Sequence, residues 1–349
     1  MMTRSSREQT LGPRIEAALV DVTPGVVLRA YSGGALACDL RLGSTQRFYD
    51  LASVTKIVFT QQAMMQAFDS GLWTLDATLG DILPDFPRPA TRITELLTHT
   101  SGIEWWMPFY ESVDRSLSWQ QRRRWLYARL CDAPCTRTGR AVYSDLGFML
   151  LGFVLEALHG RTLLQVWQEL YARTYSGSSL AFHVDNQPPH PLRDYAPTEQ
   201  CPWRLKRLQG EVHDDNTWAL GGLSTHAGLF GSIDDLTQFG LQVRAQWRGA
   251  AGAAVRQTTA RRFLQRAVAP DVGDWALGFM VPSAQGASCG SHFSAQSFGH
   301  TGFTGTSLWY DPQFDVLVCI LSNRVYGGRE NRGFLALRPQ IHNWLVESL

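Results

Sequence analysis

The sequence predicts an α/β fold, of the α+β kind, in which helices flank one antiparallel sheet that both chain ends build together. Two observations predict it. Apolar extended segments concentrate near the two ends of the chain, while the middle alternates helical periods with proline-rich and glycine-rich loops. We therefore expect one domain over residues 1–349, with the sheet at 1–79 and 266–349 and a mainly α-helical insertion at 80–265.

The N-terminal part predicts a helix, a hairpin and a second helix. Its expected elements are a helix at 5–20, extended runs at 25–30, 35–42 and 48–52, and a helix at 54–69. The pair Gly33 and Gly34 between two apolar runs is typical of a hairpin, because glycine adopts the positive φ angles of tight hairpin turns. Gly71 follows the second helix where a C-cap glycine is expected.

The middle of the chain and its C-terminal part complete the pattern. Helices are expected at 119–130, 144–158, 163–171 and 233–247, strands at 275–281, 296–300, 305–310 and 316–322, and a last helix at 333–347. The longest apolar segment lies at 146–158. It is shorter than the roughly 20 residues that a membrane span needs, so we expect a buried helix there.

Composition and charge exclude several classes of protein. The chain has a formal net charge of +1 and 44% hydrophobic residues, which is typical of a globular protein with a sizeable core. Neither nucleic acid nor a membrane is expected as a partner, because both need concentrated positive charge. The nine histidines and six cysteines have no metal-ligand spacing, and no cofactor motif is present. Scattered cysteines and the lack of a signal-peptide pattern predict a cytoplasmic location.

Lysine is almost absent from this chain. Of the 32 basic residues only Lys56 and Lys206 are lysines. Lys56 follows Ser53 by three residues where an extended run passes into a helix, so both side chains can share one face. A serine needs a neighbouring base to act as a nucleophile, and a desolvated lysine can serve as one. An N-cap serine followed by an exposed lysine explains the spacing equally well at this stage.

Two further motifs favour the catalytic interpretation. Tyr143-Ser144-Asp145 opens an apolar helix, and His300-Thr301-Gly302 lies between two C-terminal strands. The order Ser-x-x-Lys, Tyr-x-polar, His-Thr-Gly resembles the serine β-lactamase and penicillin-binding-protein family, especially its class C branch. The segments 96–102, 221–223 and 226–230 are also similar to that branch, and the resemblance spans about residues 26–323.

The resemblance implies a β-lactamase/transpeptidase-like fold and a serine hydrolase that works through an acyl-enzyme. In it Ser53 is the nucleophile, Lys56 its base, and Tyr143 the residue that either shuttles a proton to the leaving group or activates the deacylating water. The backbone N–H groups of Ser53 and Phe303 form the oxyanion hole. His300 replaces the lysine common in the third motif, and we expect it to donate a hydrogen bond to Tyr143 or to a substrate carboxylate.

Departures from the family pattern bear on the substrate. The second motif usually ends in asparagine, whereas Asp145 offers only acceptors when ionised. The segments at 196–199 and 210–216 look like a subgroup that acts on muropeptides. The residues themselves fit two interpretations equally well, a polar loop that binds substrate or a cap for the helix that follows. The substrate-binding residues expected from these comparisons and from the aromatic wall after 100–102 are Asp145, Thr301, Gly302, Trp105, Trp106, Glu211 and His213.

The preferred function is therefore hydrolysis of the amide between N-acetylmuramyl and L-alanine in a muropeptide, as in peptidoglycan recycling. The alternatives within the same fold are a carboxylesterase, a D-amino-acid peptidase and a β-lactamase. An alternative of another class is a catalytically silent binding module.

One segment matches the motif of a different class of serine hydrolase. Residues 286–290 match Gly-x-Ser-x-Gly, and Ser288 could combine with Asp311 or Asp315 and with His342 into a triad. A nucleophile elbow needs a strand before the serine and a helix directly after it. The sequence after Ser288 has no helical period, so we expect a loop of small residues.

Overall fold

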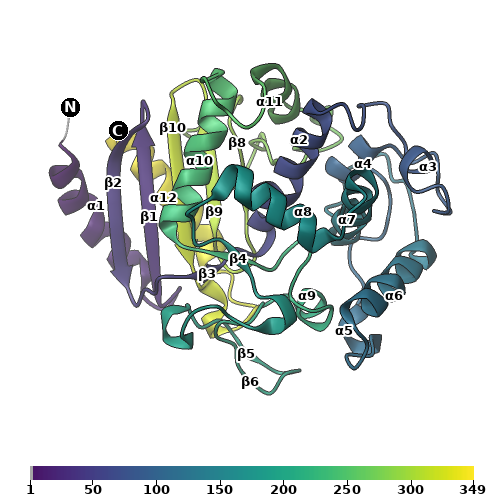
Figure 1. Cartoon of the computed structure of the whole chain (residues 1–349). Helices are drawn as coiled ribbons and strands as arrows, with labels where there is room; N and C mark the ends of the chain where they lie inside the picture. Colours follow the sequence, from purple (N-terminus) through teal and green to yellow (C-terminus); the bar gives the residue numbers. More distant parts are fainter. Residues whose placement is uncertain (1–2) are drawn as a thin grey trace.

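A five-stranded antiparallel sheet stands at the centre of the fold, with strand order β2-β1-β10-β9-β8 (Figure 1). The structure is a computed structural model and describes residues 3–349. The strands are β1 (Gly25–Ser32), β2 (Ala35–Gly43), β8 (Phe298–Thr301), β9 (Ser307–Asp311) and β10 (Val316–Ser322). Strand β1 pairs with β10 from Val26 opposite Ser322 to Ser32 opposite Val316. The prediction that both chain ends build one sheet is confirmed.

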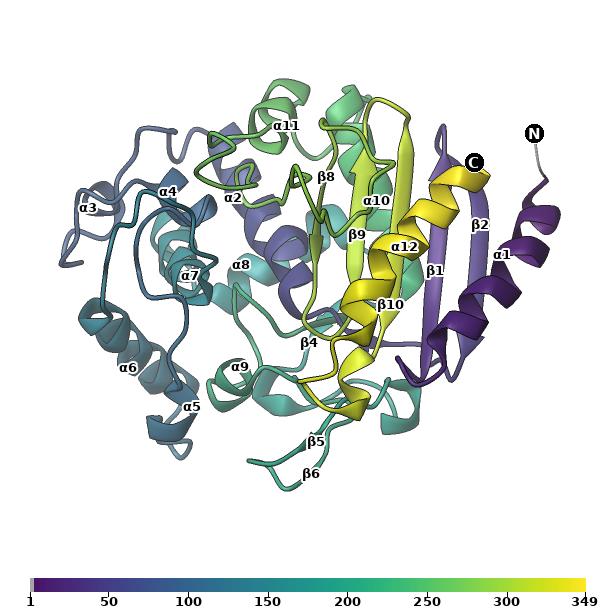
Figure 2. The ribbon, with the colours of Figure 1, turned by 180° about the vertical axis from the view of Figure 1, so that it is seen from behind.

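Helices cover both faces of this sheet. Helices α1 (Arg4–Leu19) and α12 (Gly333–Ser348) lie on one face, as Figure 2 shows, and α10 (Ile233–Arg248) lies on the other. Side chains alternate along β10, because strand residues point to opposite faces. Val318 and Ile320 join the core with α1 and α12, whereas Leu317 and Cys319 join the core with α10. Helix α10, although it falls within residues 80–265, therefore packs on the sheet.

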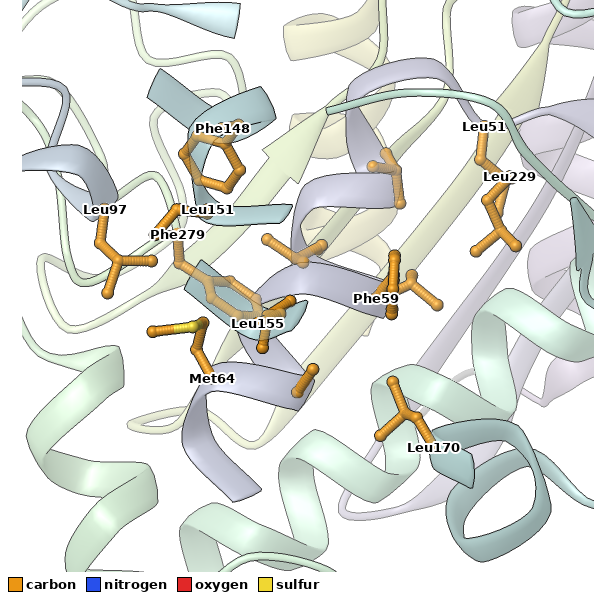
Figure 3. Close-up of a cluster of buried hydrophobic side chains, with 14 of the residues drawn as sticks. Leu51, Phe59, Met64, Leu97, Phe148, Leu151, Leu155, Leu170, Leu229 and Phe279 are labelled. Carbon is orange, nitrogen blue, oxygen red and sulfur yellow. The ribbon is translucent and has the colours of Figure 1, made fainter. Parts of the chain in front are cut away.

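The helical part lies beside the sheet. Its helices are α2 (Gln62–Asp69), α3 (Leu79–Ile82), α4 (Ile93–Leu97), α5 (Phe109–Ser112), α6 (Trp119–Asp132), α7 (Asp145–His159), α8 (Leu163–Leu170), α9 (Asp215–Ala219) and α11 (Gln257–Leu264). As predicted, the apolar helix α7 is buried. Figure 3 shows its Phe148, Leu151 and Leu155 gathered with Phe59 and Met64 from the helical segment that follows Ser53.

No single helix within residues 3–349 has both the length and the apolar composition of a membrane span. One strongly bent pair of helices, 145–159 with 163–175, meets those criteria by length and composition.

The structure corrects three sequence predictions. The helix predicted at 54–69 is a 3₁₀ turn (Ala52–Val54), a π-helical stretch (Lys56–Gln61) and then α2. The strand predicted at 275–281 is wrong: within it Gly278 has φ 91°, and isolated bridges alone remain. The run at 48–52 contributes only two residues of strand.

The short strands form two small sheets apart from the central one. They are β3 (Tyr49–Asp50), β4 (Ala181–Phe182) and β7 (Leu229–Gly231) in one, and β5 (Gln200–Cys201) and β6 (Lys206–Arg207) in the other. Pairing of β3 with β7 brings the segment just before Ser53 against the segment just after His226.

Candidate active site

Ser53 lies on a tight turn between β3 and the helical segment that leads to α2. The preceding residue, Ala52, has φ 47°, a left-handed conformation that is unfavourable for any residue with a Cβ. The buried Asp50 carboxylate accepts a hydrogen bond from the Ala52 N–H at 2.8 Å. Strained backbone of this kind persists only where its surroundings hold it, and it is common at functional sites.

Lys56 is fully buried and turned toward Ser53. Its Nζ donates to Ser53 Oγ at 3.1 Å, to Asp145 Oδ1 at 2.7 Å and to the backbone carbonyl of His226 at 2.9 Å. The alternative of an N-cap serine with an exposed lysine is therefore wrong. The nucleophile and the base of the expected pair are within hydrogen-bond distance.

The pKa of Lys56 is raised above its ordinary value. Burial alone lowers this pKa, but the Asp145 carboxylate, and then Tyr143, raise it by more. Lys56 is consequently an ammonium near neutral pH. Asp145, expected to contact substrate, instead forms an ion pair with the lysine and keeps 19% of its side chain exposed.

Tyr143 flanks the ammonium. Its ring centroid lies 4.8 Å from Lys56 Nζ, and its hydroxyl is buried without a hydrogen-bond partner in the part of the chain described. Burial raises the pKa of this phenol, against the opposing charge of Lys56. Tyr143 is thus a neutral proton donor in the resting site.

His300 lies on β8 with its ring centroid 6.1 Å from that of Tyr143. Its Nδ1 bonds to the carbonyl of Thr301 at 2.8 Å, and a carbonyl can only accept. Burial, and then the charge of Lys56, lower the pKa of His300 to about 3, so the ring is neutral. Its Nε2, buried and unpartnered among residues 3–349, is then an acceptor. The expectation that His300 donates to Tyr143 is wrong, because its one ring proton is already committed.

His99 was not predicted as a site residue. Its Nδ1 accepts from the N–H of Ser144 at 3.0 Å, and its ring centroid lies 4.6 Å from Tyr143 and 4.3 Å from Trp275. His99 therefore orients the second motif through this hydrogen bond and its ring contact with Tyr143. The sequence of segment 96–102 resembles the class C branch, but it gives no signal that its histidine would hydrogen-bond to the backbone of Ser144.

The loop after His300 is tied to the Ser53 turn. Thr304 Oγ1 donates to the carbonyl of Asp50 at 2.7 Å, and Thr306 Oγ1 donates to that of Leu51 at 2.9 Å. A Cβ at Gly302 would lie 2.6 Å from the Leu51 carbonyl, so only glycine allows this approach. The next N–H, that of Phe303, donates to no acceptor in the described chain. The loop that carries this N–H is thus held against the segment directly before Ser53.

The remaining predicted substrate residues differ in exposure. Trp105 is 54% exposed, and its carbonyl accepts from the Asp145 N–H at 2.9 Å, with Trp106 next to it. Thr301 Oγ1 lies 3.9 Å from the sulfur of Met280. Glu211 and His213, in contrast, face other protein groups.

Glu211 and His213 are both engaged in contacts within the protein. Glu211 accepts from Trp218 Nε1 at 3.1 Å and pairs with Lys206 at 2.7 Å. His213 is buried and stacks on Phe303. The prediction that these two side chains contact substrate is not supported by their partners.

Three groups of metal-ligating type also meet here. Asp145, Asp214 and His226 have ligand atoms within 4.8 Å of one another. Asp214 accepts from His226 Nε2 at 3.1 Å, and Lys56 bonds to Asp145 and to the His226 carbonyl. Because the lysine ammonium supplies the positive charge at this place, we assign no metal site to it.

Ser288 does not form a nucleophile elbow. No strand precedes it and no helix follows it, and its hydroxyl is buried without a partner among the described residues. His342 Nε2 lies 3.3 Å from Ser307 Oγ instead. The Gly-x-Ser-x-Gly match is a loop of small residues, as expected.

Known proteins are similar to this chain over most of its length. A family model described as beta-lactamase matches residues 13–338. An N-acetylmuramyl-L-alanine amidase from Bacillus subtilis (strain 168) is 30% identical over 347 residues, covering 88% of this chain and 77% of the relative.

Two solved structures share the fold. EstCE1, described as a hydrolase with promiscuous acyltransferase activity, has a TM-score of 0.70 at 21% identity and covers 98% of both chains. A penicillin-binding protein from Bacillus halodurans has a TM-score of 0.67 at 17% identity, covering 92% of this chain and 96% of its own.

Proposed function

This chain belongs to the beta-lactamase family of serine hydrolases, and from that premise we propose that it cleaves the amide between an N-acetylmuramyl group and L-alanine. The 30% identical amidase supports this substrate class. The observation that carries the proposal is a row of aromatic side chains that starts beside Asp145.

The aromatic row begins at the exposed Trp105 and continues through partly buried rings, of which Tyr110, Trp203 and Trp218 also pack against the core. Successive ring centroids are 6.0 Å apart from Trp105 to Trp106, 6.4 Å from Trp106 to Tyr110, 4.7 Å from Tyr110 to Trp203 and 5.4 Å from Trp203 to Trp218. Aromatic faces with a few polar groups between them suit a sugar ring. A short-chain ester has no ring that would stack on such a row.

Acylation begins with deprotonation of Ser53. Lys56 becomes a base once it passes a proton to Asp145 Oδ1 at 2.7 Å, and a substrate that excludes water from Asp145 favours this neutral pair. Ser53 Oγ then bonds to the carbonyl carbon of the substrate while its proton moves to Lys56 Nζ. The N–H groups of Ser53 and Phe303 receive the charge that develops on the carbonyl oxygen.

Collapse of the tetrahedral intermediate breaks the C–N bond. The leaving amine of L-alanine takes the hydroxyl proton of Tyr143, and Lys56 returns its proton to Tyr143. His300 Nε2 has no partner in the described resting site and is an acceptor available to that hydroxyl during the reaction. Asp145 then reprotonates Lys56, and water hydrolyses the ester on Ser53 to release N-acetylmuramic acid.

A substrate panel tests the proposal. We expect kcat/KM for N-acetylmuramyl-L-alanine to exceed the values for a D-Ala-D-Ala peptide, a chromogenic cephalosporin and a short-chain ester. Trp105→Ala is expected to raise KM for the muramyl substrate by about tenfold, as loss of one stacking contact would, and to leave ester hydrolysis unchanged. A cephalosporin or an ester preferred by orders of magnitude would overturn the amidase proposal.

The cytoplasmic location and the role in peptidoglycan recycling are further parts of the proposal. Cell fractionation with an antibody to the chain tests the first, and accumulation of uncleaved muropeptides in a deletion strain tests the second.

A further inference from the structure

Phe303 is held between two charged or polar side chains. Its ring stacks on that of His213, with centroids 5.5 Å apart and planes at 28°. The Arg324 guanidinium lies over the ring, with Cζ 4.5 Å from the centroid. Phe303 itself is 48% exposed, so these two neighbours, rather than burial in a core, fix its position.

Arg324 also holds the Phe303 backbone. Its Nε donates to the Phe303 carbonyl at 2.6 Å, and its backbone N–H donates to the carbonyl of Thr304 at 2.9 Å. The other guanidinium bonds go to the carbonyls of Arg329 and Asn331. Two hydrogen bonds and one ring contact thus join a single arginine to the loop of the second oxyanion donor.

The environment of Arg324 is unusual for a buried cation. The side chain is 2% exposed, and in the described chain its guanidinium bonds to carbonyl oxygens and to no carboxylate. Buried charges are normally paired, because an uncompensated charge is costly to desolvate. The backbone carbonyls of Phe303, Arg329 and Asn331 hold this guanidinium in place instead.

Asp50 joins this arrangement to the nucleophile. Its buried carboxylate accepts from the His213 N–H at 2.7 Å and from the Ala52 N–H at 2.8 Å, and its carbonyl accepts from Thr304 Oγ1. The residue before Ser53 and the residue that stacks on Phe303 therefore share one acceptor. On the far side of the His213 ring, Nε2 lies 3.5 Å from the Glu199 carboxylate.

We propose that His213 and Arg324 are positioning residues that clamp Phe303 as the second arm of the oxyanion hole, with Asp50 fixing this arm relative to Ser53. The clamp rests on the proposed acyl-enzyme and the role of the Phe303 N–H, and not on the identity of the acyl group. It gives the segment at 210–216 a role in transition-state stabilisation instead of substrate contact.

The test compares an ester with its thionoester, in which sulfur replaces the carbonyl oxygen. Sulfur accepts hydrogen bonds weakly, so an intact oxyanion hole favours the ester strongly. We expect Arg324→Met to lower kcat for the ester by about 10- to 100-fold, less than the loss of a whole donor, with little change in KM. The thionoester rate should fall much less, so the oxygen-to-sulfur preference shrinks by a similar factor.

Conservative variants and a matched control separate positioning from general damage. His213→Phe keeps the stacked ring and is expected to retain most activity, whereas His213→Ala is expected to lose it as Arg324→Met does. Arg14→Met is the control. Arg14 Cζ lies 4.2 Å from the ring centroid of Trp344, so the variant removes a similar arginine–aromatic contact between residues that are not part of the proposed site. If Arg324→Met does not fold, judged by circular dichroism, the two His213 variants carry the test.

Two results would overturn the clamp: equal losses for ester and thionoester, which leave the oxygen-to-sulfur preference unchanged, or equal activity of His213→Ala and His213→Phe. Failure of the proposed function has a different signature. A wild-type protein that cleaves the ester but not the muramyl amide refutes the amidase proposal alone. Absence of a fluorophosphonate adduct on wild-type Ser53 refutes the acyl-enzyme and, with it, the clamp.

Discussion

The fully buried Lys56 and the partly exposed Asp145 form an ion pair, with 2.7 Å between Nζ and Oδ1. The pair stores the catalytic amine in its protonated form. Any change that weakens the negative charge of Asp145, including the binding of substrate, therefore makes it easier for Lys56 to lose a proton and act as a base.

Replacing Asp145 by asparagine should release the base. Burial of Lys56 persists in Asp145→Asn while the carboxylate that raises the lysine pKa is gone, so that pKa falls. We expect the acid limb of kcat/KM for a simple ester to move to lower pH by about one unit or more. Asp76→Asn, at a side chain that is 94% exposed, is the control. An acid limb that stays in place would show that Lys56 does not set it.

The same substitution should alter stability in a defined pH range. The folded-state pKa of Lys56 is raised, so the pair stabilises the fold fully below the ordinary lysine pKa near 10.5 and loses that effect as pH rises through the folded value. Asp145→Asn leaves a buried amine unpaired and is expected to cost about 3 kcal/mol or less at pH 7, since the amine can deprotonate. Urea unfolding at pH 7 measures the loss.

Lys56→Arg tests the need for a side chain that can lose a proton. Arginine keeps the charge opposite Asp145 but stays protonated at any pH a protein tolerates. We expect acylation by a fluorophosphonate, followed by intact mass, to slow by about 10²-fold or more. Lys206→Arg changes the one other lysine, which is 51% exposed, and should acylate at the wild-type rate. Wild-type acylation of Lys56→Arg would exclude the lysine as the base.

The sequence sufficed to predict that both chain ends build one sheet and that Ser53 can lie beside Lys56, because strand patterns and a three-residue spacing are local signals. It could not predict that Asp145 bonds to the lysine, since the two residues are 89 positions apart. The sequence also could not predict that His213 stacks on Phe303, 90 positions away, because an isolated histidine in a polar segment suggests a contact with substrate. The false strand at 275–281 followed from apolar residues that are buried without pairing, because Gly278 turns the chain.

His300 should act as an acceptor for the Tyr143 hydroxyl. His300→Gln keeps an oxygen that can accept, whereas His300→Phe fills the space without one. We expect kcat to fall by about 10- to 100-fold in His300→Phe, the scale of one proton-transfer partner, and by less in His300→Gln. Since the pKa of His300 is about 3, neither variant should remove a titration between pH 5 and 8 from the rate profile. Such a removal would show that the ring is protonated near neutrality.

Acid should destabilise the protein through buried neutral histidines, and His342 offers the clearest case. Burial, and then the charge of Arg338 one helical turn earlier on α12, lower the pKa of His342 to about 3. A depressed folded-state pKa stabilises the fold fully above the ordinary value of about 6.5, and that stabilisation is lost as pH falls toward 3. Between those limits the unfolded chain binds one more proton at this position, so His342 contributes about 1.4 kcal/mol of stability loss per pH unit.

His342→Gln should be less stable at pH 7, because the contact with Ser307 changes, yet its free energy of unfolding should decline less steeply between pH 6 and 4. His292→Gln, at a side chain that is 42% exposed, removes a histidine without a buried ring and should keep more of the wild-type slope. Equal slopes for the wild type and His342→Gln would mean that His342 takes up no extra proton on unfolding, and the acid sensitivity would then lie elsewhere among the buried histidines.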